Sequence, residues 1–235
     1  MHAAVGARLR AIEPGRAEAT MPAADPDGLD AALWVLADFV SGLAVTGTLG
    51  SGERITTLRL TLHVIARDGV TGTLHGTGWL DEKSEVGLST AVITDDDGRT
   101  VARAVGRNAI LADEVAASTW PGHAPAWSDP PRRAADLLAD GAAPDPASVN
   151  HAGVVQGGML ASLPARALAD LLGGPADEAT ATFLRAVPAG PSDGRTLHTA
   201  PELEHGGRRL RSGRVVLRHG DDRTVLTVTG LRYAP

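Results

Sequence analysis

Residues 150–161 read Asn-His-Ala-Gly-Val-Val-Gln-Gly-Gly-Met-Leu-Ala, and a largely apolar sequence continues from there to Leu172. This pattern predicts a helix over residues 156–172, kinked at Pro164, that begins at a pair of glycines. The first N–H groups of a helix have no partner inside the helix and attract negative charge, and glycines let a ligand approach them closely. We therefore interpret this stretch as a candidate site for a group that develops negative charge. The alternative is a glycine-rich loop that only starts a helix.

A second apolar helix is predicted over residues 30–45, and Asp38 lies near its middle. Asp38 is the only charged residue between Ala31 and Gly52. Removing a carboxylate from water is costly unless the group is paired or serves chemistry. Burial would also raise the pKa of Asp38, which suits a general base. The spacing alone leaves open the alternative that Asp38 faces water on the outer side of the helix.

Runs with the alternating pattern of β-strands precede and follow the two predicted helices. In the first part of the chain they cover residues 7–21, with a turn at 14–15, and residues 55–66, 70–81, 85–95 and 100–111. In the second part they cover residues 180–187, 196–205, 208–218 and 223–233. The final strands align without gaps, because residues 97–106 match residues 221–230 at an offset of 124. The chain is thus predicted to be a duplicated α+β unit whose two copies share one core.

The duplication predicts a division into an N-terminal repeat over residues 1–111, a linker over 112–148 and a C-terminal repeat over 149–235. The linker is rich in proline, and we expect one short helix in it near residues 131–140. Its two tryptophans indicate that it packs on the body of the protein.

Composition excludes several classes of protein. The chain of 235 residues has no cysteine, which excludes disulfides, thiolate metal sites and cysteine nucleophiles. Its formal net charge of −6 argues against a nucleic-acid-binding protein held by phosphate contacts. We find no apolar run that approaches the ~20 residues needed to span a membrane, and no secretory signal, so we expect no membrane partner. The composition is rich in arginine, alanine and glycine, as in GC-rich genomes, and we expect a cytoplasmic bacterial protein.

The stretch Asn-x-x-Gly-x-x-Gln-Gly-Gly, followed by an apolar helix, is similar to the Asn-x-x-Gly-x-x-His-Gly-Gly signature of a known family. The family is the hotdog-fold acyl-CoA thioesterases of the phenylacetyl-CoA and 4-hydroxybenzoyl-CoA thioesterase superfamily. The resemblance implies a double hotdog, in which two antiparallel sheets, each wrapped around a central helix, are joined in one chain. It also implies sites shared between two copies. One copy provides a catalytic Asp or Glu, nine residues after the His position, and the other provides the glycine-rich start of its helix.

The two halves match this signature in complementary ways. In the second half, nine residues after Gln156, stands Ala165 instead of a carboxylate. The first half keeps a carboxylate, Asp38, but its His-Gly-Gly positions read Leu29-Asp30-Ala31. The resemblance therefore implies one composite site between the halves and one inactive site at Ala165. The composite site would contain Asp38 from the first half together with Asn150, Gln156, Gly157 and Gly158 from the second.

The resemblance implies an acyl-CoA thioesterase with this single site. The thioester carbonyl would lie against the Gly157 N–H, and Asp38 would either deprotonate a water molecule or attack the carbonyl to give a mixed anhydride. Asn150 and Gln156 would orient the water or the carbonyl. The residues expected to contact the substrate are Gly158, Ser41, Trp34 and Met159. Coenzyme A would enter as part of the substrate, so we expect no cofactor and no metal, and two such chains could form a homodimer.

A non-catalytic acyl-CoA-binding protein of the same fold is the main alternative, because Gln156 cannot take up a proton as histidine can. A dehydratase or hydratase of this fold would need an Asp and a His on one segment, which the sequence lacks. Two other motifs have simpler explanations. His205-Gly206-Gly207 precedes arginines rather than an apolar helix and predicts a hairpin turn. Residues 190–194 match the Gly-x-Ser-x-Gly of serine hydrolases but lie in a predicted loop.

Overall fold

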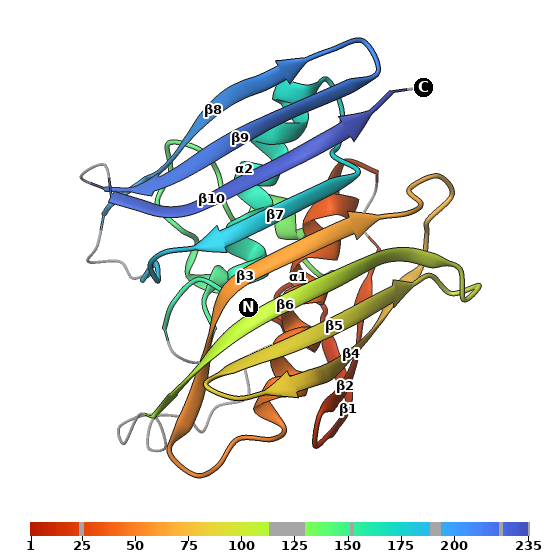
Figure 1. Ribbon diagram of the computed structural model, residues 1–235, viewed down its shortest axis with the longest axis vertical. Coiled ribbons are helices and arrows are strands. Elements are labelled where there is room, and N and C mark those ends of the chain that lie inside the picture. Colours follow the sequence, from red (N-terminus) through yellow and green to blue (C-terminus); the bar gives the residue numbers. More distant parts are fainter. Residues whose placement is uncertain (24–25, 113–129, 151–152, 189–193, 221–222, 235) are drawn as a thin grey trace.

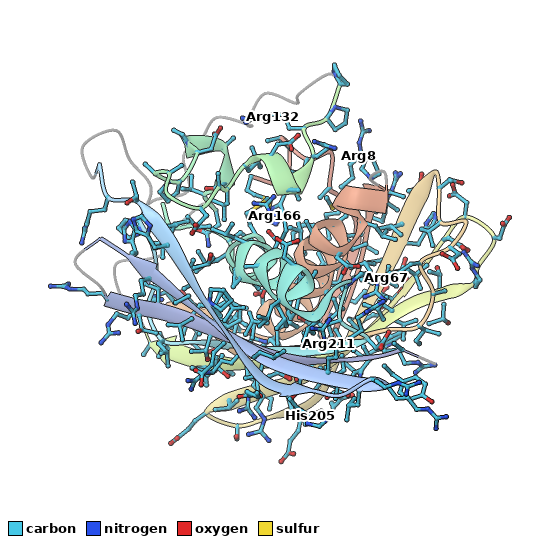
Figure 2. The ribbon with its side chains drawn as sticks, turned by 90° about the horizontal axis from the view of Figure 1, so that it is seen from above. Arg8, Arg67, Arg132, Arg166, His205 and Arg211 are labelled. Atoms are coloured by element: carbon cyan, nitrogen blue, oxygen red, sulfur yellow. The ribbon has the colours of Figure 1, made fainter. Side chains whose placement is uncertain are left out.

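Two helices lie side by side against one face of a single curved antiparallel sheet (Figure 1). A computed structural model gives this structure and describes residues 1–23, 26–112, 130–150, 153–188, 194–220 and 223–234. Seen from above, both helices sit on the inner face of the sheet, and residues 130–148 lie on the far side of the helices from the sheet (Figure 2). The sheet has ten strands in the order β1-β2-β4-β5-β6-β3-β7-β10-β9-β8.

The helices and strands have the following bounds. The helices are α1 (Pro26–Thr46) and α2 (Gly157–Leu172), and two 3-10 turns, η2 (Ala134–Asp136) and η3 (Pro146–Ser148), lie between them. The strands of the first half are β1 (Arg8–Glu13), β2 (Arg16–Pro22), β3 (Glu53–Val64), β4 (Thr73–Lys83), β5 (Val86–Thr94) and β6 (Thr100–Ala112). The strands of the second half are β7 (Glu178–Phe183), β8 (Leu197–Gly206), β9 (Leu210–His219) and β10 (Arg223–Tyr233).

The sheet is symmetric about its central pair, β3 and β7. On one side β6, β5 and β4 follow β3, and on the other side β10, β9 and β8 follow β7. Each set of four strands comes directly after one helix in the chain. The unit of one helix and four strands therefore occurs twice, in agreement with the gapless alignment of residues 97–106 with 221–230. The hairpin of β1 and β2 extends the first unit at its outer edge.

The two halves form one continuous sheet, so the prediction of two separate sheets is wrong. Strands β3 and β7 pair in antiparallel register, from Arg59 opposite Thr182 to His63 opposite Glu178. Without this pairing, each half would expose the N–H and C=O groups of a long strand edge. The duplicated halves remove that cost because the first strand after each helix, β3 or β7, pairs with the corresponding strand of the other half.

Helix bounds follow local sequence signals. α1 begins at Pro26, four residues before the predicted start, because proline is favoured in the first turn of a helix, where its missing N–H is not needed. α2 has the predicted range and continues through Pro164 to Gly173, whose left-handed backbone (φ 71°) caps its C-terminus. The expected linker helix near 131–140 is reduced to the single turn η2, which packs against both helices. Trp120 and Trp127 lie outside the described residues.

α1 is more apolar than the sequence analysis recognised. Its stretch Gly28–Thr46 is long and apolar enough, by length and composition, to cross a membrane, which corrects the statement that no run approaches that length. In this structure 83% of the stretch is buried inside the protein, against the sheet and α2. A core helix enclosed on all sides has the same composition as a membrane span because both lack polar faces.

Glycines on the inner face of the sheet let α1 approach the strands closely. A Cβ atom on Gly78 of β4 would lie 2.6 Å from the carbonyl carbon of Val40, which is closer than real contacts allow. A Cβ atom on Gly87 of β5 would lie 2.7 Å from a methyl group of Val45. The helix backbone therefore rests directly on the strands.

Gly78→Ala should destabilise the protein by about 1–3 kcal/mol, since α1 would have to move away from β4 to accept the methyl group. Urea unfolding of the variant and the wild type measures the difference. Gly50→Ala is the matched control, because a Cβ atom there meets nothing closer than Glu53 at 3.5 Å. Equal stability of Gly78→Ala and Gly50→Ala would contradict the close packing of α1 on β4.

Candidate active site

Asp38 lies between α1 and α2 with 8% of its surface exposed, so the alternative of a water-facing carboxylate is wrong. One carboxylate oxygen, Oδ2, accepts hydrogen bonds from the Gly158 N–H at 3.0 Å and from Nε2 of Gln156. The other, Oδ1, accepts one from the Thr57 hydroxyl at 2.9 Å. The structure thus brings the carboxylate of the first repeat to the start of the helix of the second repeat.

Gln156 connects this carboxylate to α2. It is the N-cap of the helix, with an extended backbone, and its Oε1 accepts a hydrogen bond from the Met159 N–H at 2.7 Å. Its Nε2 then points to Asp38. A side-chain amide has one acceptor and one donor end, so a single glutamine can cap the helix and hold the carboxylate at the same time.

The two glycines allow α1 and α2 to meet at this point. A Cβ atom on Gly158 would lie 2.7 Å from the carbonyl carbon of Trp34, so any larger residue would push the helices apart. A Cβ atom on Gly157 would lie 3.0 Å from Oδ2 of Asp38 and 3.1 Å from Oδ1. The backbone of Gly157 therefore lies against the carboxylate, with no side chain between them.

One N–H group at the start of α2 has no acceptor among the described residues. The Gly158 N–H is bonded to Asp38, and the Met159 and Leu160 N–H groups are bonded to Gln156, the latter at 2.8 Å through its carbonyl oxygen. The Gly157 N–H remains, on a residue that is only partly buried. It offers a hydrogen-bond donor at the positive end of a helix, next to a carboxylate.

Burial is the main influence on the charge of Asp38. Desolvation raises the pKa of its carboxyl above the ordinary value, while the hydrogen bonds from Gly158, Thr57 and Gln156 oppose the shift. Within the described part of the chain no arginine, lysine or histidine forms an ion pair with Asp38. A carboxylate whose pKa is raised is a stronger base than an ordinary aspartate, which suits the acceptance of a proton from a neighbouring group.

Asn150 takes part in the loop before α2 and forms no hydrogen bond to Asp38. Its Oδ1 accepts from the Val154 N–H at 3.4 Å, and its backbone pairs with Val154 and Gly153, whose φ is 74°. This turn sets the direction in which the chain enters Gln156. The expected role of Asn150 in orienting a water or a carbonyl stays a prediction.

The residues predicted to contact a substrate are mostly in the core. Trp34 and Met159 are 2% and 0% exposed, and both pack in the main hydrophobic cluster. Ser41 is also buried, and its hydroxyl lies 3.4 Å from the carbonyl oxygen of Asp38. Their contact with a substrate stays a prediction, as does that of Gly158.

Thr57 is a site residue that the sequence analysis missed. Strict alternation places it on the same face as Arg59, which is exposed. The register of β3 with β6 shifts between these two residues, so Leu58 is a β-bulge that reverses the alternation. Thr57 therefore faces α1 while Arg59 faces outward. A bulge of this kind leaves no recognisable signal in a single sequence.

The position predicted for an inactive second site lacks both functional groups. Ala165 provides no carboxylate, and Asp30 stands at the position that aligns with Gly157. Because α1 begins at Pro26, Asp30 lies in the second turn of this helix and not at its start. Asp30 forms an ion pair with Arg67 at 3.0 Å, and Arg67 also donates to the Ala176 carbonyl oxygen of the second half. The aligned position therefore carries a charged side chain inside a helix, where the second half has a glycine at a helix start.

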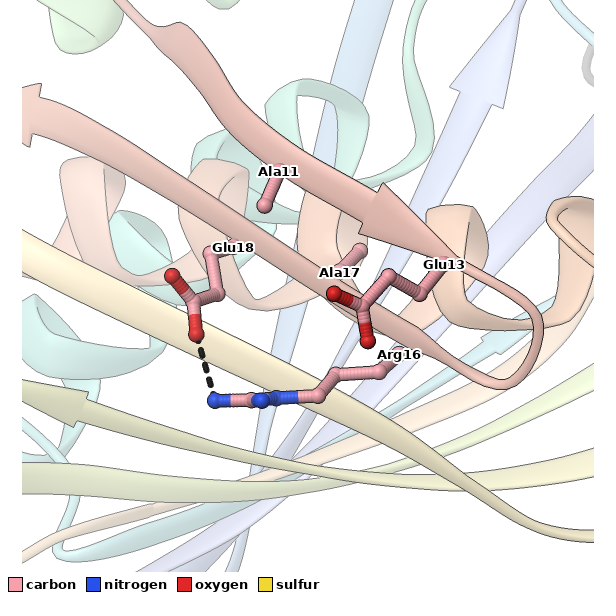
Figure 3. Close-up of a pocket in the computed structure, with 5 residues that line it drawn as sticks. All are labelled: Ala11, Glu13, Arg16, Ala17 and Glu18. Atoms are coloured by element: carbon pink, nitrogen blue, oxygen red, sulfur yellow. Dashed lines mark hydrogen bonds and ion pairs between the residues drawn. The ribbon is translucent and has the colours of Figure 1, made fainter.

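The other motifs lie apart from Asp38. His205-Gly206-Gly207 stands at the turn between β8 and β9, as predicted, and residues 190–193 lie outside the described residues. In the described ranges no three His, Asp or Glu side chains group to hold a metal. A shallow hollow on the hairpin of β1 and β2, where Arg16 pairs with Glu18, shares no residue with the Asp38 site (Figure 3).

A comparison with solved structures gives a match over the whole length of the chain. It is the 12:0-ACP thioesterase from Umbellularia californica, with a TM-score of 0.62 and 13% identity, covering 97% of this chain and 94% of that one. The chain has the hotdog fold. Models of protein families and curated proteins give no match to its sequence.

Several smaller proteins match about half of the chain. A putative thioesterase related to phenylacetic acid degradation, from Ralstonia eutropha JMP134, is 25% identical and covers 47% of this chain and 88% of that one, with a TM-score of 0.42. A hypothetical thioesterase with coenzyme A, from Streptococcus pneumoniae TIGR4, is 17% identical and covers 48% of this chain and 92% of that one, with a TM-score of 0.43.

Thr57→Val should raise the pKa of Asp38 further, because it removes a hydrogen bond that stabilises the ionised carboxylate. Thr57→Ser keeps the hydroxyl and should leave the pKa unchanged. A titration of the Asp38 carboxyl carbon by NMR measures both. As a control, Thr90→Val removes a hydroxyl that donates to Asp81 at 3.2 Å and should not affect Asp38. A pKa that stays constant in Thr57→Val would show that the Thr57 hydroxyl does not hold the carboxylate.

Proposed function

We propose that the chain is a thioester hydrolase that acts on acyl-CoA at one composite site between its repeats. The observation that carries the proposal is the Gly157 N–H at the start of α2, which has no acceptor in the described part of the chain and lies beside the buried carboxylate of Asp38. The names of the structures with similar folds support the reaction class, since they are thioesterases. Two other structures that match about half of the chain, from Streptococcus pneumoniae and Streptococcus mutans, are described with coenzyme A and acetyl-CoA respectively, the carrier that we propose here.

The Gly157 N–H would bind the carbonyl oxygen of the thioester. This N–H is fixed by the helix before the substrate arrives and lies at the positive end of α2. When a nucleophile adds to the carbonyl carbon, the oxygen becomes negative, and a donor that is already in position stabilises that charge without reorganising. The glycine has no side chain, so the carbonyl can reach the backbone.

Asp38 would activate the attack in one of two ways. As a general base, it takes a proton from a water molecule, the oxygen of which adds to the carbonyl carbon. The tetrahedral intermediate then breaks its C–S bond, and the departing thiolate of coenzyme A receives the proton from Asp38. As a nucleophile, Asp38 would displace the thiolate to form a mixed anhydride, which water then hydrolyses. In both routes Oδ1 is the better placed oxygen, because it accepts one hydrogen bond whereas Oδ2 accepts two.

The structure also supports an alternative, a protein that binds acyl-CoA without hydrolysing it. Both Gln156 Nε2 and the Gly158 N–H are engaged with Asp38, so two of the polar groups at the helix start are already satisfied. A substrate held only by the Gly157 N–H, with Asp38 stabilised as it is, could remain bound without turnover. Thiol release distinguishes the two functions.

Asp38→Asn should lower kcat/KM for acyl-CoA by about 10²–10⁴, since the amide cannot accept the proton or attack. Release of free thiol from a panel of acyl-CoA thioesters measures the loss. Wild-type activity should also fall at low pH, because Asp38 must be ionised, and the decline should begin above the ordinary pKa of aspartate. Asp170→Asn, at an exposed position on α2, is the matched control and should keep full activity. Unchanged turnover in Asp38→Asn would exclude the proposed base, and binding without turnover in the wild type would favour the alternative.

Gly157→Pro should lower kcat by about 10²–10³, because it removes the N–H donor from the carbonyl. Proline is tolerated at the first position of a helix, and the extended backbone of Gln156 (φ −63°, ψ 141°) is compatible with a following proline. Gly157→Ala is the matched control, since it adds a Cβ atom but keeps the donor. A proline variant as active as the alanine variant would exclude this N–H from the reaction.

A further inference from the structure

Two buried polar side chains beneath α1 have no hydrogen-bond partner among the described residues. Asn108 on β6 is 1% exposed, and both the nitrogen and the oxygen of its amide lack a partner. Ser89 on β5 is 0% exposed, and its hydroxyl lacks one too. Buried polar groups are nearly always satisfied, because leaving them unpaired costs free energy. Two in neighbouring strands point to a group from outside the chain.

Asn108 lies next to the residue that holds Asp38. It stands directly opposite Thr57 in the pairing of β6 with β3, and paired residues face the same side of a sheet. Their Cβ atoms are then about 5 Å apart. Since the Thr57 hydroxyl donates to Oδ1 of Asp38, the free amide lies one strand away from the oxygen that would activate the attack.

Ser89 and Ser41 extend this polar region along the underside of α1. A Cβ atom on Gly106 would lie 2.9 Å from the Ser89 hydroxyl and 3.1 Å from the Ser41 hydroxyl, so the absent side chain leaves room for both. Gly106 is two residues from Asn108 on the same face of β6. We call Ser41, Ser89 and Asn108 the polar cluster. The proposed hydrolysis mechanism uses none of its side chains.

We propose that the polar cluster binds a hydroxyl group on the acyl chain of the substrate, close to the thioester. This inference rests on the proposed function, which places the thioester carbonyl between Asp38 and Gly157. An oxygen on the third carbon of the acyl group lies a few ångströms from the carbonyl carbon, which matches the spacing of about 5 Å between neighbouring strands. The substrate class is then 3-hydroxyacyl thioesters.

The chemistry of the cluster fits a hydroxyl group. The amide of Asn108 offers one acceptor and two donors, and the Ser89 hydroxyl can donate and accept. A hydroxyl group of the substrate also donates and accepts. It can therefore bind both the nitrogen and the oxygen of the Asn108 amide, or one of these atoms together with the Ser89 hydroxyl. An unsubstituted acyl chain would leave them unpaired, and sites with unpaired polar groups discriminate strongly against such analogues.

The first experiment compares hexanoyl-CoA with 3-hydroxyhexanoyl-CoA in the wild type. We expect kcat/KM to favour the hydroxylated substrate by about tenfold or more. Asn108→Leu, which has a similar volume and no polar group, should reduce this preference to near one while keeping activity on hexanoyl-CoA. It should also have an equal or higher Tm, because it replaces an unpaired polar group by an apolar one.

Serine variants provide a matched pair. Ser89→Ala should weaken the preference for the hydroxylated substrate. Ser162→Ala should leave it unchanged, because the Ser162 hydroxyl is buried but already donates to the Met159 carbonyl oxygen at 2.7 Å. Equal effects of the two variants would contradict a role for the cluster.

The outcomes separate this inference from the proposed function. Hydrolysis of hexanoyl-CoA without a preference for the hydroxylated substrate overturns the inference and leaves the function intact. A preference that persists in Asn108→Leu also overturns the inference, because the amide then does not bind the hydroxyl group. An Asn108→Leu variant that fails to fold overturns it too, because the amide is then needed for the structure of the protein itself. If the wild type hydrolyses no thioester, the proposed function fails. The two ligands are then compared by calorimetry, where equal affinities overturn the inference.

Discussion

A buried negative charge at the start of a helix is the interaction on which the rest of this structure depends. Asp38 comes from one repeat and the Gly158 N–H from the other. A carboxylate buried without partners would strongly destabilise the protein, and a buried helix start needs acceptors for its N–H groups, so each satisfies the other. The contact requires glycine at 158, because α2 approaches the backbone of Trp34 directly. The two repeats therefore cannot pack together in this way without also bringing Asp38 to the start of α2.

The parts of the fold that the sequence predicted are those with a strong local signal. Gln156, Gly157 and the apolar run after them indicated where α2 starts, and the lone charge on α1 indicated Asp38. The resemblance to the hotdog thioesterases, whose sites are shared between two copies, then implied that these groups meet, although neither helix shows by itself what it faces. The continuous sheet was missed because a strand carries no mark of whether its edge pairs with its own repeat or with the next. Thr57 was missed because the bulge at Leu58 reverses the alternation.

The two repeats differ at the positions that align with each other near their helix starts. In the second repeat, Gln156 caps α2 and holds Asp38, and the Gly157 N–H has no acceptor among the described residues. In the first repeat, the aligned residue is Asp30, in the second turn of α1, and it pairs with Arg67, which also joins the carbonyl oxygen of Ala176 in the other half. The same position in the alignment thus belongs to a helix start in one repeat and to a contact between the repeats in the other. A fused chain permits this division, since its two copies need not have the same sequence.

The seam between β3 and β7 also constrains the contact between Asp38 and the start of α2. β3 pairs with the second repeat from Arg59 to His63, and a few residues earlier it positions Asp38 through Thr57. Because side chains alternate between faces, the strands could only slip by two residues without turning the sheet inside out, and that step is about 7 Å. Such a step would carry the acid past the helix that it must meet. The register of β3 with β7 can therefore change only in steps much larger than a hydrogen bond, so a sheet paired in its observed register keeps Asp38 within reach of the start of α2.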